Sequence, residues 1–225
     1  MISDYVNIIA SGSDGNCTII KNSIAVDIGI PFSKLRPFHR DLKLVLLTHE
    51  HQDHFNARTV RKLSSLRPSL RFACCEWMVP FLIGAEVPKQ NIDVMEPDLW
   101  NYYKGIEGSI SPFRTLHNVP NCGWRILLEK TTPCNSHATK ILYATDLSTL
   151  DGIEAKNYDL YMIECNHREA EIEAKIAEKT AAGEFSYEVE AARNHLSWEQ
   201  AMDWLSDNGP SGWFIPMHQH MEKER

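Results

Sequence analysis

The feature that most constrains this chain is a cluster of histidines and one carboxylate that follows an apolar run. Residues 42–48 read Leu-Lys-Leu-Val-Leu-Leu-Thr, which is typical of a buried strand, and the next six residues are His-Glu-His-Gln-Asp-His. Imidazole and carboxylate groups are the ligands that zinc-like divalent metals prefer. In an extended loop, alternation points His49 and His51 the same way, and Asp53 and His54 can then turn toward a second ion. The pattern predicts a metal site; the alternative is a solvated polar loop.

Length and composition limit the class of protein. A chain of 225 residues with 43% hydrophobic and 24% charged residues is ordinary for a soluble globular protein, and we expect one domain over 1–225. No apolar segment reaches the roughly 18 residues of a membrane span, and the N-terminus has no basic flank or apolar core. The six cysteines form no CxxC pair. These features predict a cytoplasmic protein without a membrane partner.

The pattern along the chain indicates two β-sheets with helices outside them. Short apolar runs separated by turns fill the first half, with helical spacing of apolar residues at 60–66, and residues 92–147 read mainly as strands. The charged, alanine-rich segment 169–194 predicts helix, with Gly183 as a break. A further helix should begin after Ser197, since a glutamine three residues later completes a capping box. This succession of strands and helices predicts an α/β sandwich of the αβ/βα kind.

The histidine motif resembles the HxHxDH signature of the metallo-β-lactamase fold hydrolases. Further motifs of that family match in order: Asp27 ends an early strand, His117 follows a β segment, Asp146 ends a strand and His218 ends the last strand. The resemblance implies a four-layer sandwich of two mixed sheets flanked by helices. It also implies two divalent ions, with zinc the first choice and manganese the alternative. One ion would be held by His49, His51 and His117, the other by Asp53, His54 and His218, with Asp146 bridging.

Two positions near these ligands stay open on the sequence alone. His220 competes with His218 as the last ligand, because both follow the final strand. Asp27 fits a structural support of the histidine loop better than a ligand.

Three shorter segments are similar to the YycJ/WalJ-like branch of this family. They are Ser-Gly-Ser-Asp-Gly-Asn at 11–16, Glu-Cys-Asn-His at 164–167 and Asn-His-Leu-Ser at 194–197. In the related tRNase Z phosphodiesterases, a histidine at the position of His195 is the general acid for the leaving oxygen. The resemblance therefore implies Asp53 and His195 as catalytic residues. It implies Asn16 and His167 as substrate-binding residues, and the alternative for His167 is a residue that merely ends a strand.

The sequence departs from this branch at several positions. Asp14 replaces a serine, Asn194 replaces a glycine, and Gln219-His220 replace Leu-Ser. These departures affect the inference about substrate and leave the predicted metal ligands intact.

The branch implies two substrates. One group, the phage anti-Pycsar proteins, are homodimeric phosphodiesterases that open cyclic mononucleotides such as cyclic CMP and cyclic UMP; another is proposed to be a 5′-3′ DNA exonuclease. The formal charge of −7 favours a small nucleotide, because a DNA channel needs clustered cations. The basic stretch 58–71 reads first as a solvated helix face. We therefore expect a cyclic-nucleotide phosphodiesterase and homodimer, with nucleic acid as partner under the alternative.

Two other classes are less favoured by the residues. A hydrolase of thioesters, lactones or β-lactams would not need the His195 motif. A catalytically inactive binding protein would be expected to lack ligands, whereas every ligand position is filled here.

Overall fold

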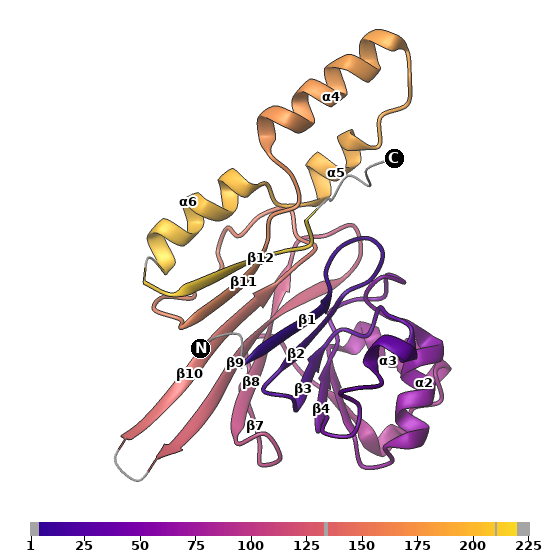
Figure 1. The fold of residues 1–225 in the computed structure, drawn as a ribbon, viewed down its shortest axis with the longest axis vertical. Coiled ribbons are helices and arrows are strands. Elements are labelled where there is room, and N and C mark those ends of the chain that lie inside the picture. Colours follow the sequence, from indigo (N-terminus) through magenta and orange to yellow (C-terminus); the bar gives the residue numbers. More distant parts are fainter. Residues whose placement is uncertain (1–4, 133–134, 210, 220–225) are drawn as a thin grey trace. The chain divides into compact units, whose positions relative to one another are not determined.

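A computed structural model describes residues 5–132, 135–209 and 211–219, and it does not describe the side chains of residues 130–137. The chain forms two mixed β-sheets flanked by helices, which confirms the fold class predicted from the sequence (Figure 1). No helix in the described part of the chain is long and apolar enough to cross a membrane.

The first sheet has six strands in the order β1-β2-β3-β4-β5-β6. The β1, β2 and β3 strands pair antiparallel, and β3 to β6 run parallel. The parallel strands are short and almost wholly apolar, as expected where both faces of a sheet are covered. The strands are β1 (Val6–Ala10), β2 (Cys17–Ile20), β3 (Ile24–Val26), β4 (Leu44–Leu46), β5 (Arg71–Cys74) and β6 (Ile92–Val94).

Short helices connect the parallel strands of the first sheet, and α2 and α3 lie beside it in Figure 1. Val60 and Leu63 of α2 and Leu82 of α3 are fully buried and join Val45 and Phe72 of the sheet in one apolar core. That burial explains the helical spacing seen in the sequence. The helices are α1 (Phe32–Leu35), α2 (Ala57–Leu66), α3 (Val79–Gly84) and the 3-10 turns η2 (Glu76–Met78) and η3 (Lys89–Asn91).

The second sheet also has six strands, in the order β12-β11-β10-β9-β8-β7. The β10, β11 and β12 strands run parallel, whereas β7 and β8 form an antiparallel pair. The strands are β7 (Asn101–Tyr103), β8 (Gly108–Thr115), β9 (Asn121–Thr132), β10 (Asn135–Ala144), β11 (Leu160–Glu164) and β12 (Trp213–Met217).

The chain divides into two compact units. The first contains residues 1–113 and 124–139, and the second contains residues 114–123 and 140–225. A single domain over 1–225 stays a prediction.

The helices of the second unit are α4 (Glu169–Ala182), α5 (Glu188–Asn194) and α6 (Trp198–Asn208). Gly183 ends α4 with a φ of 68°, a left-handed conformation that glycine adopts at no steric cost. Ser197 caps α6, and its reciprocal bonds with Gln200 form the expected capping box. These two signals place the helix ends where the sequence predicted them.

Three residues predicted to support or bind metal have left-handed backbone at the ends of parallel strands. The φ angles are 58° at Asp27, 57° at Asp146 and 50° at His218. Such a conformation is unfavourable for a residue with a side chain and concentrates at functional positions.

Candidate functional site

In the first unit, Asp27 fixes the start of the histidine loop. The carboxylate is fully buried and accepts hydrogen bonds from the backbone N–H of Thr48 (3.0 Å) and from its hydroxyl (2.9 Å). The Nδ1–H of His54 donates to the same carboxylate at 2.7 Å. Burial raises the pKa of Asp27, and the contacts with His54 and Thr48 oppose that rise. Asp27 therefore orients the loop, as the sequence suggested.

The three histidines of the loop lie together. The ring centroids of His49 and His51 are 4.7 Å apart and those of His49 and His54 are 4.2 Å apart. Nδ1 of His49 lies 2.9 Å from the Thr48 hydroxyl. That hydroxyl gives its proton to Asp27, so it accepts from His49. Asp53 completes the group, with Oδ2 at 3.5 Å from Nε2 of His54.

Asn16, predicted to bind substrate, is fully buried against this loop. Its amide nitrogen lies 2.8 Å from Nε2 of His54 and 3.2 Å from Oδ2 of Asp53. Because Nδ1 of His54 carries the proton given to Asp27, Nε2 accepts from Asn16. A metal bound to Nε2 of His54 would use that same lone pair. The hydrogen bond from the Asn16 amide would then have to break. Asn16 thus acts on the loop itself, and a contact with substrate stays a prediction.

Gly29 allows the chain after β3 to pack closely against the backbone of the histidine loop. A Cβ at this position would lie 1.6 Å from the carbonyl oxygen of Asp53. In the observed packing, the Ile28 N–H donates to His54 O and the Asn16 N–H donates to Asp53 O. The absence of a side chain is therefore required here.

In the second unit, Asp146 is the centre of a cluster of imidazoles. Its Oδ1 lies 3.6 Å from Nε2 of His218, 3.9 Å from Nε2 of His117 and 3.7 Å from Nδ1 of His195. These distances exceed hydrogen-bond range. Two ligand atoms at about 2.1 Å from one tetrahedral metal are about 3.4 Å apart, close to the observed spacing. Asp146 with Nε2 of His117 and Nε2 of His218 therefore fits a divalent ion. His195 is not part of this donor set, because its Nδ1 is hydrogen-bonded to Glu164.

Glu164, at the end of β11, joins this cluster. It is fully buried and accepts from Nδ1 of His195 (2.7 Å) and Nδ1 of His218 (2.9 Å). The backbone N–H groups of Leu147 and Leu196 also donate to it, at 2.9 and 3.3 Å. Burial alone would raise the pKa of Glu164, but the hydrogen bonds from the two histidines outweigh this effect and lower the pKa. Glu164 is thus a charged acceptor that fixes two imidazole rings.

The surroundings of His195 favour its protonated form, which a proton donor requires. Burial disfavours its charged form, but the hydrogen bond and charge of Glu164, with Asp146, outweigh this and raise the pKa of His195. Its ring stacks on His218 at 5.1 Å and meets His117 edge-on at 5.5 Å. Since Nδ1 is bound to Glu164, Nε2 is the atom that exchanges a proton.

Four of the predicted ligands share one arrangement. In each, the protein engages Nδ1 and thereby selects Nε2 as the coordinating nitrogen, the usual outer support of a metal-bound histidine. The supports are a carboxylate, a hydroxyl or a backbone carbonyl. The pairs are His49 with Thr48, His54 with Asp27, His117 with the carbonyl of Asn194 (3.3 Å) and His218 with Glu164.

His167, the second predicted substrate-binding residue, lines a cavity of about 260 Å³ in the second unit. His220, the competitor of His218, lies outside the described residues. The structure describes His218, which the Asp146 and Glu164 carboxylates flank.

Two functional residues were not identified from the sequence. The 164–167 segment was recognised only as a similar motif, and the role of Glu164 follows from tertiary contacts. Asn121 donates from its amide to the carbonyls of Thr145 (3.0 Å) and Asp146 (2.6 Å), which holds the left-handed turn. The sequence signals for Glu164 are that motif and an acid directly after the apolar Leu-Tyr-Met-Ile run, and neither specifies its contacts.

Comparison with known families decides the class of protein. The sequence model described as "Beta-lactamase superfamily domain" matches residues 27–219. The chain belongs to the beta-lactamase superfamily. The match extends from Asp27 to one residue beyond His218 and so includes every predicted metal ligand. No curated protein sequence matches.

Solved structures confirm the fold of this superfamily member. The metallo-beta-lactamase fold protein YhfI from Bacillus subtilis matches with a TM-score of 0.68 and 18% identity, over 97% of this chain and 87% of that one. The short form of human tRNase Z matches with a TM-score of 0.66 and 12% identity, over 96% and 92%. A diphosphatase of the PhnP family matches with a TM-score of 0.61 and 11% identity, over 95% and 85%. The predicted metallo-β-lactamase fold is therefore confirmed.

Proposed function

We propose that this protein is a metal-dependent phosphodiesterase that opens cyclic mononucleotides, such as cyclic CMP and cyclic UMP, to linear monophosphates. In a phage such an enzyme would act against a host defence signal. The observation that carries the proposal is His195, held by Glu164 beside Asp146 and two predicted ligands. Phosphodiester cleavage must protonate a departing alkoxide, and a positioned imidazole supplies that proton. The tRNase Z and PhnP-family names of similar folds agree with phosphoester chemistry.

The metal ligands would be those predicted from the sequence. We propose two divalent ions, zinc first and manganese second. When bound, they would supply Lewis-acid stabilisation of phosphate charge and an activated water. The residues are His49, His51, Asp53, His54, His117, Asp146 and His218.

The protein's own groups then have separate tasks. Asp27 and Glu164 orient imidazoles, and neither needs to touch the substrate. His195 holds a proton on Nε2, which it gives to the leaving oxygen, and Glu164 stabilises the imidazolium before the transfer. Asp53 belongs to the ligand loop and is expected to be essential for turnover.

The cyclic substrate is preferred to DNA on electrostatic grounds. Binding along a phosphate backbone draws on clustered Lys and Arg, and the net charge of −7 opposes it. The basic stretch predicted to be a solvated face is α2 and its flanks, where Arg67 donates to the carbonyls of His39 and Leu42 and Arg71 pairs with Asp93. Two of its cations are therefore used within the protein.

The test is a substrate panel on the purified protein with zinc or manganese. Cyclic CMP, UMP, AMP and GMP are incubated separately, and 5′-phosphorylated DNA is incubated in parallel. Loss of a cyclic nucleotide with appearance of the linear monophosphate supports the proposal. Shortened DNA with intact cyclic nucleotides replaces it with the exonuclease alternative.

Two variants make the panel specific. His195→Ala should lower turnover by about 10²–10⁴-fold with metal content unchanged. His39→Ala is the matched control, because His39 is a half-buried histidine of the first unit whose Nδ1 lies 2.7 Å from the carbonyl oxygen of Arg36, away from the predicted ligands in the sequence. Loss of a metal ion in His195→Ala would instead make His195 a ligand.

The resemblance also predicts a cytoplasmic homodimer. Light scattering coupled to size exclusion measures the oligomeric state directly, and a mass of one chain would exclude the dimer.

A further inference from the structure

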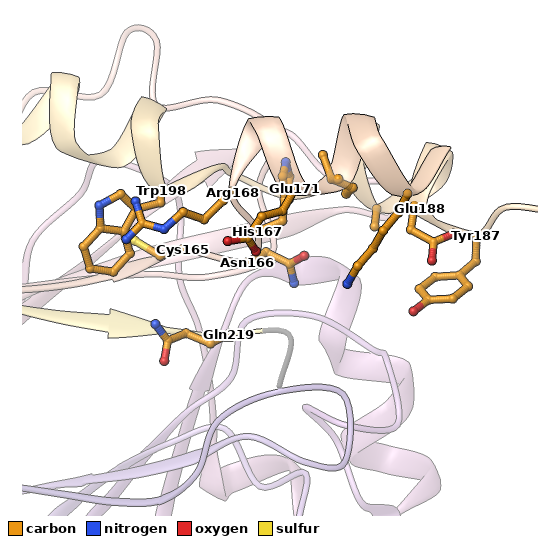
Figure 2. Close-up of a pocket in the computed structure, with 12 residues that line it drawn as sticks. Cys165, Asn166, His167, Arg168, Glu171, Tyr187, Glu188, Trp198 and Gln219 are labelled. Atoms are coloured by element: carbon orange, nitrogen blue, oxygen red, sulfur yellow. The ribbon is translucent and has the colours of Figure 1, made fainter. Parts of the chain in front are cut away.

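The second unit contains a cavity that the proposed chemistry does not yet use. Its volume is about 260 Å³. Figure 2 shows Trp198 and Arg168 at one end and Tyr187 at the other, with Asn166 and His167 between them. Residues of α4 and α5 also line the cavity, and they are Glu171, Ile172, Lys175, Glu188 and Ala191. Gln219 and Cys165 complete the lining.

Formal charges in the cavity cancel. Arg168 and Lys175 are cations, and Glu171 and Glu188 are carboxylates. Arg168 lies 3.5 Å from Glu199, and Glu188 accepts a hydrogen bond of 2.5 Å from a lysine of α4. A site for a bare phosphate would carry an excess of cations, so a neutral ligand fits this lining better.

The remaining polar groups are neutral and of the kind that read the edge of a heterocycle. They are the amides of Asn166 and Gln219 and the ring of His167. Burial lowers the pKa of His167, which favours its neutral form. Within the described part of the chain, its Nδ1 is buried with no hydrogen-bond partner. A bound molecule with polar edges would supply that partner.

Aromatic rings occupy both ends of the cavity. Trp198 has the Arg168 guanidinium over one face at 4.6 Å and meets Phe214 edge-on at 6.0 Å. Tyr187 remains half exposed, with Lys179 at 4.5 Å from its ring centroid. Aromatic and cation-backed rings are the surfaces on which nucleobases stack.

One wall of the cavity adjoins the Asp146 cluster. The Asn166 amide donates to the carbonyl of His218 at 3.1 Å, and Asn166 is two residues from Glu164. His167 accepts a backbone hydrogen bond from Trp198, the first residue of α6. A ligand in this cavity would therefore lie beside the His218 backbone.

We propose that this cavity binds the nucleoside part of the substrate, so that α4 and α5 determine which phosphodiesters are accepted. The proposal rests on the proposed function for its substrate class. The ligand class is a single nucleoside, because the volume is below the roughly 300–1,000 Å³ of sites for larger ligands.

The test measures binding without catalysis. Cytidine and adenosine, which lack phosphate, are titrated calorimetrically into the zinc-reconstituted protein and into Tyr187→Ala, Tyr187→Phe and His167→Ala. We expect at least one nucleoside to bind the wild type, about tenfold or more weaker binding in both alanine variants, and retention in Tyr187→Phe, which keeps the ring. The KM for cyclic CMP should rise in the same two alanine variants. Their metal content should equal that of the wild type.

Phe185→Ala is the matched control. Phe185 lies in the same connection between α4 and α5, is 82% exposed and does not line the cavity. Its nucleoside affinity should equal that of the wild type. Absence of nucleoside binding to the wild type, or an equal loss in Phe185→Ala, overturns the proposal.

The two proposals can fail separately. A protein that binds cytidine but hydrolyses no cyclic nucleotide retains the cavity assignment and loses the proposed function. A protein that hydrolyses cyclic CMP, binds no nucleoside and shows an unchanged KM in Tyr187→Ala retains the function and loses the cavity assignment.

Discussion

Replacement of Glu164 by glutamine tests whether one buried carboxylate orients both His195 and His218. Four donors meet this carboxylate: Nδ1 of each histidine and the backbone N–H groups of Leu147 and Leu196. A glutamine of the same shape has one acceptor oxygen, and its NH₂ group would face donors. About two of the four hydrogen bonds are therefore lost.

The magnitude follows from those bonds. Hydrogen bonds to a charged group contribute about 1.5–3 kcal/mol each, so two lost bonds cost about 3 kcal/mol at the lower value. For a chain of this length that corresponds to a fall in Tm of about 6–12 °C. Loss of the outer support of a metal-bound histidine weakens metal affinity or activity by about 10–100-fold.

The assay combines three readouts on Glu164→Gln. They are the Tm, zinc affinity by competition with a chelator, and turnover of bis(p-nitrophenyl) phosphate, a phosphodiester without a nucleoside. Glu188→Gln is the matched control, because Glu188 is a buried carboxylate with side-chain hydrogen bonds outside the Asp146 cluster. Its Tm should fall while zinc affinity stays at the wild-type value. Wild-type zinc affinity and turnover in Glu164→Gln would refute the positioning role.

Three further outcomes are expected. Asp27→Asn should weaken zinc binding about 10–100-fold by releasing His54, which competition titration measures; unchanged affinity would remove Asp27 from the site. Gly29→Ala should lower the Tm or prevent folding, because its Cβ meets the carbonyl of Asp53, and a wild-type melting curve would contradict this packing. Burial opposes ionisation of Glu188, but hydrogen bonds lower its pKa from 4.5 to about 2, so the carboxylate stabilises the fold above pH 4.5 and loses this effect as the pH falls toward 2. The Tm difference between wild type and Glu188→Gln should therefore shrink on acidification, and a constant difference from pH 6 to pH 3 would exclude this linkage.

Local signals predicted the helix ends well and the strand ends less well. The capping box at Ser197 and the left-handed Gly183 act within a few residues, so the sequence contains all the information needed. The run 42–48 was predicted as one strand, but β4 is only Leu44–Leu46. Thr48 is buried, yet its N–H turns to the Asp27 side chain. Burial continues past the strand, so apolar character alone cannot mark its end.

The candidate ligands could be predicted from the sequence, whereas the residues that support them could not. The ligands of the histidine loop are adjacent in sequence and form a recognisable motif. The supports act over distance: Glu164 reaches His195 and His218 from another strand, and Asn121 holds the Asp146 turn from β9. Nothing in the neighbouring residues of either one specifies that contact. Tertiary packing assigns these roles, so only the structure could show them.

Metal content is the measurement that tests the central claim most directly. The protein is stripped with a chelator, reconstituted with zinc or manganese, and analysed for metal per chain alongside phosphodiester hydrolysis. Reconstitution should give about two ions per chain, and hydrolysis should be lost with the metal and restored by it. A chain that binds no stoichiometric ion, or one whose hydrolysis survives complete removal of metal, would contradict a metal-dependent phosphodiesterase.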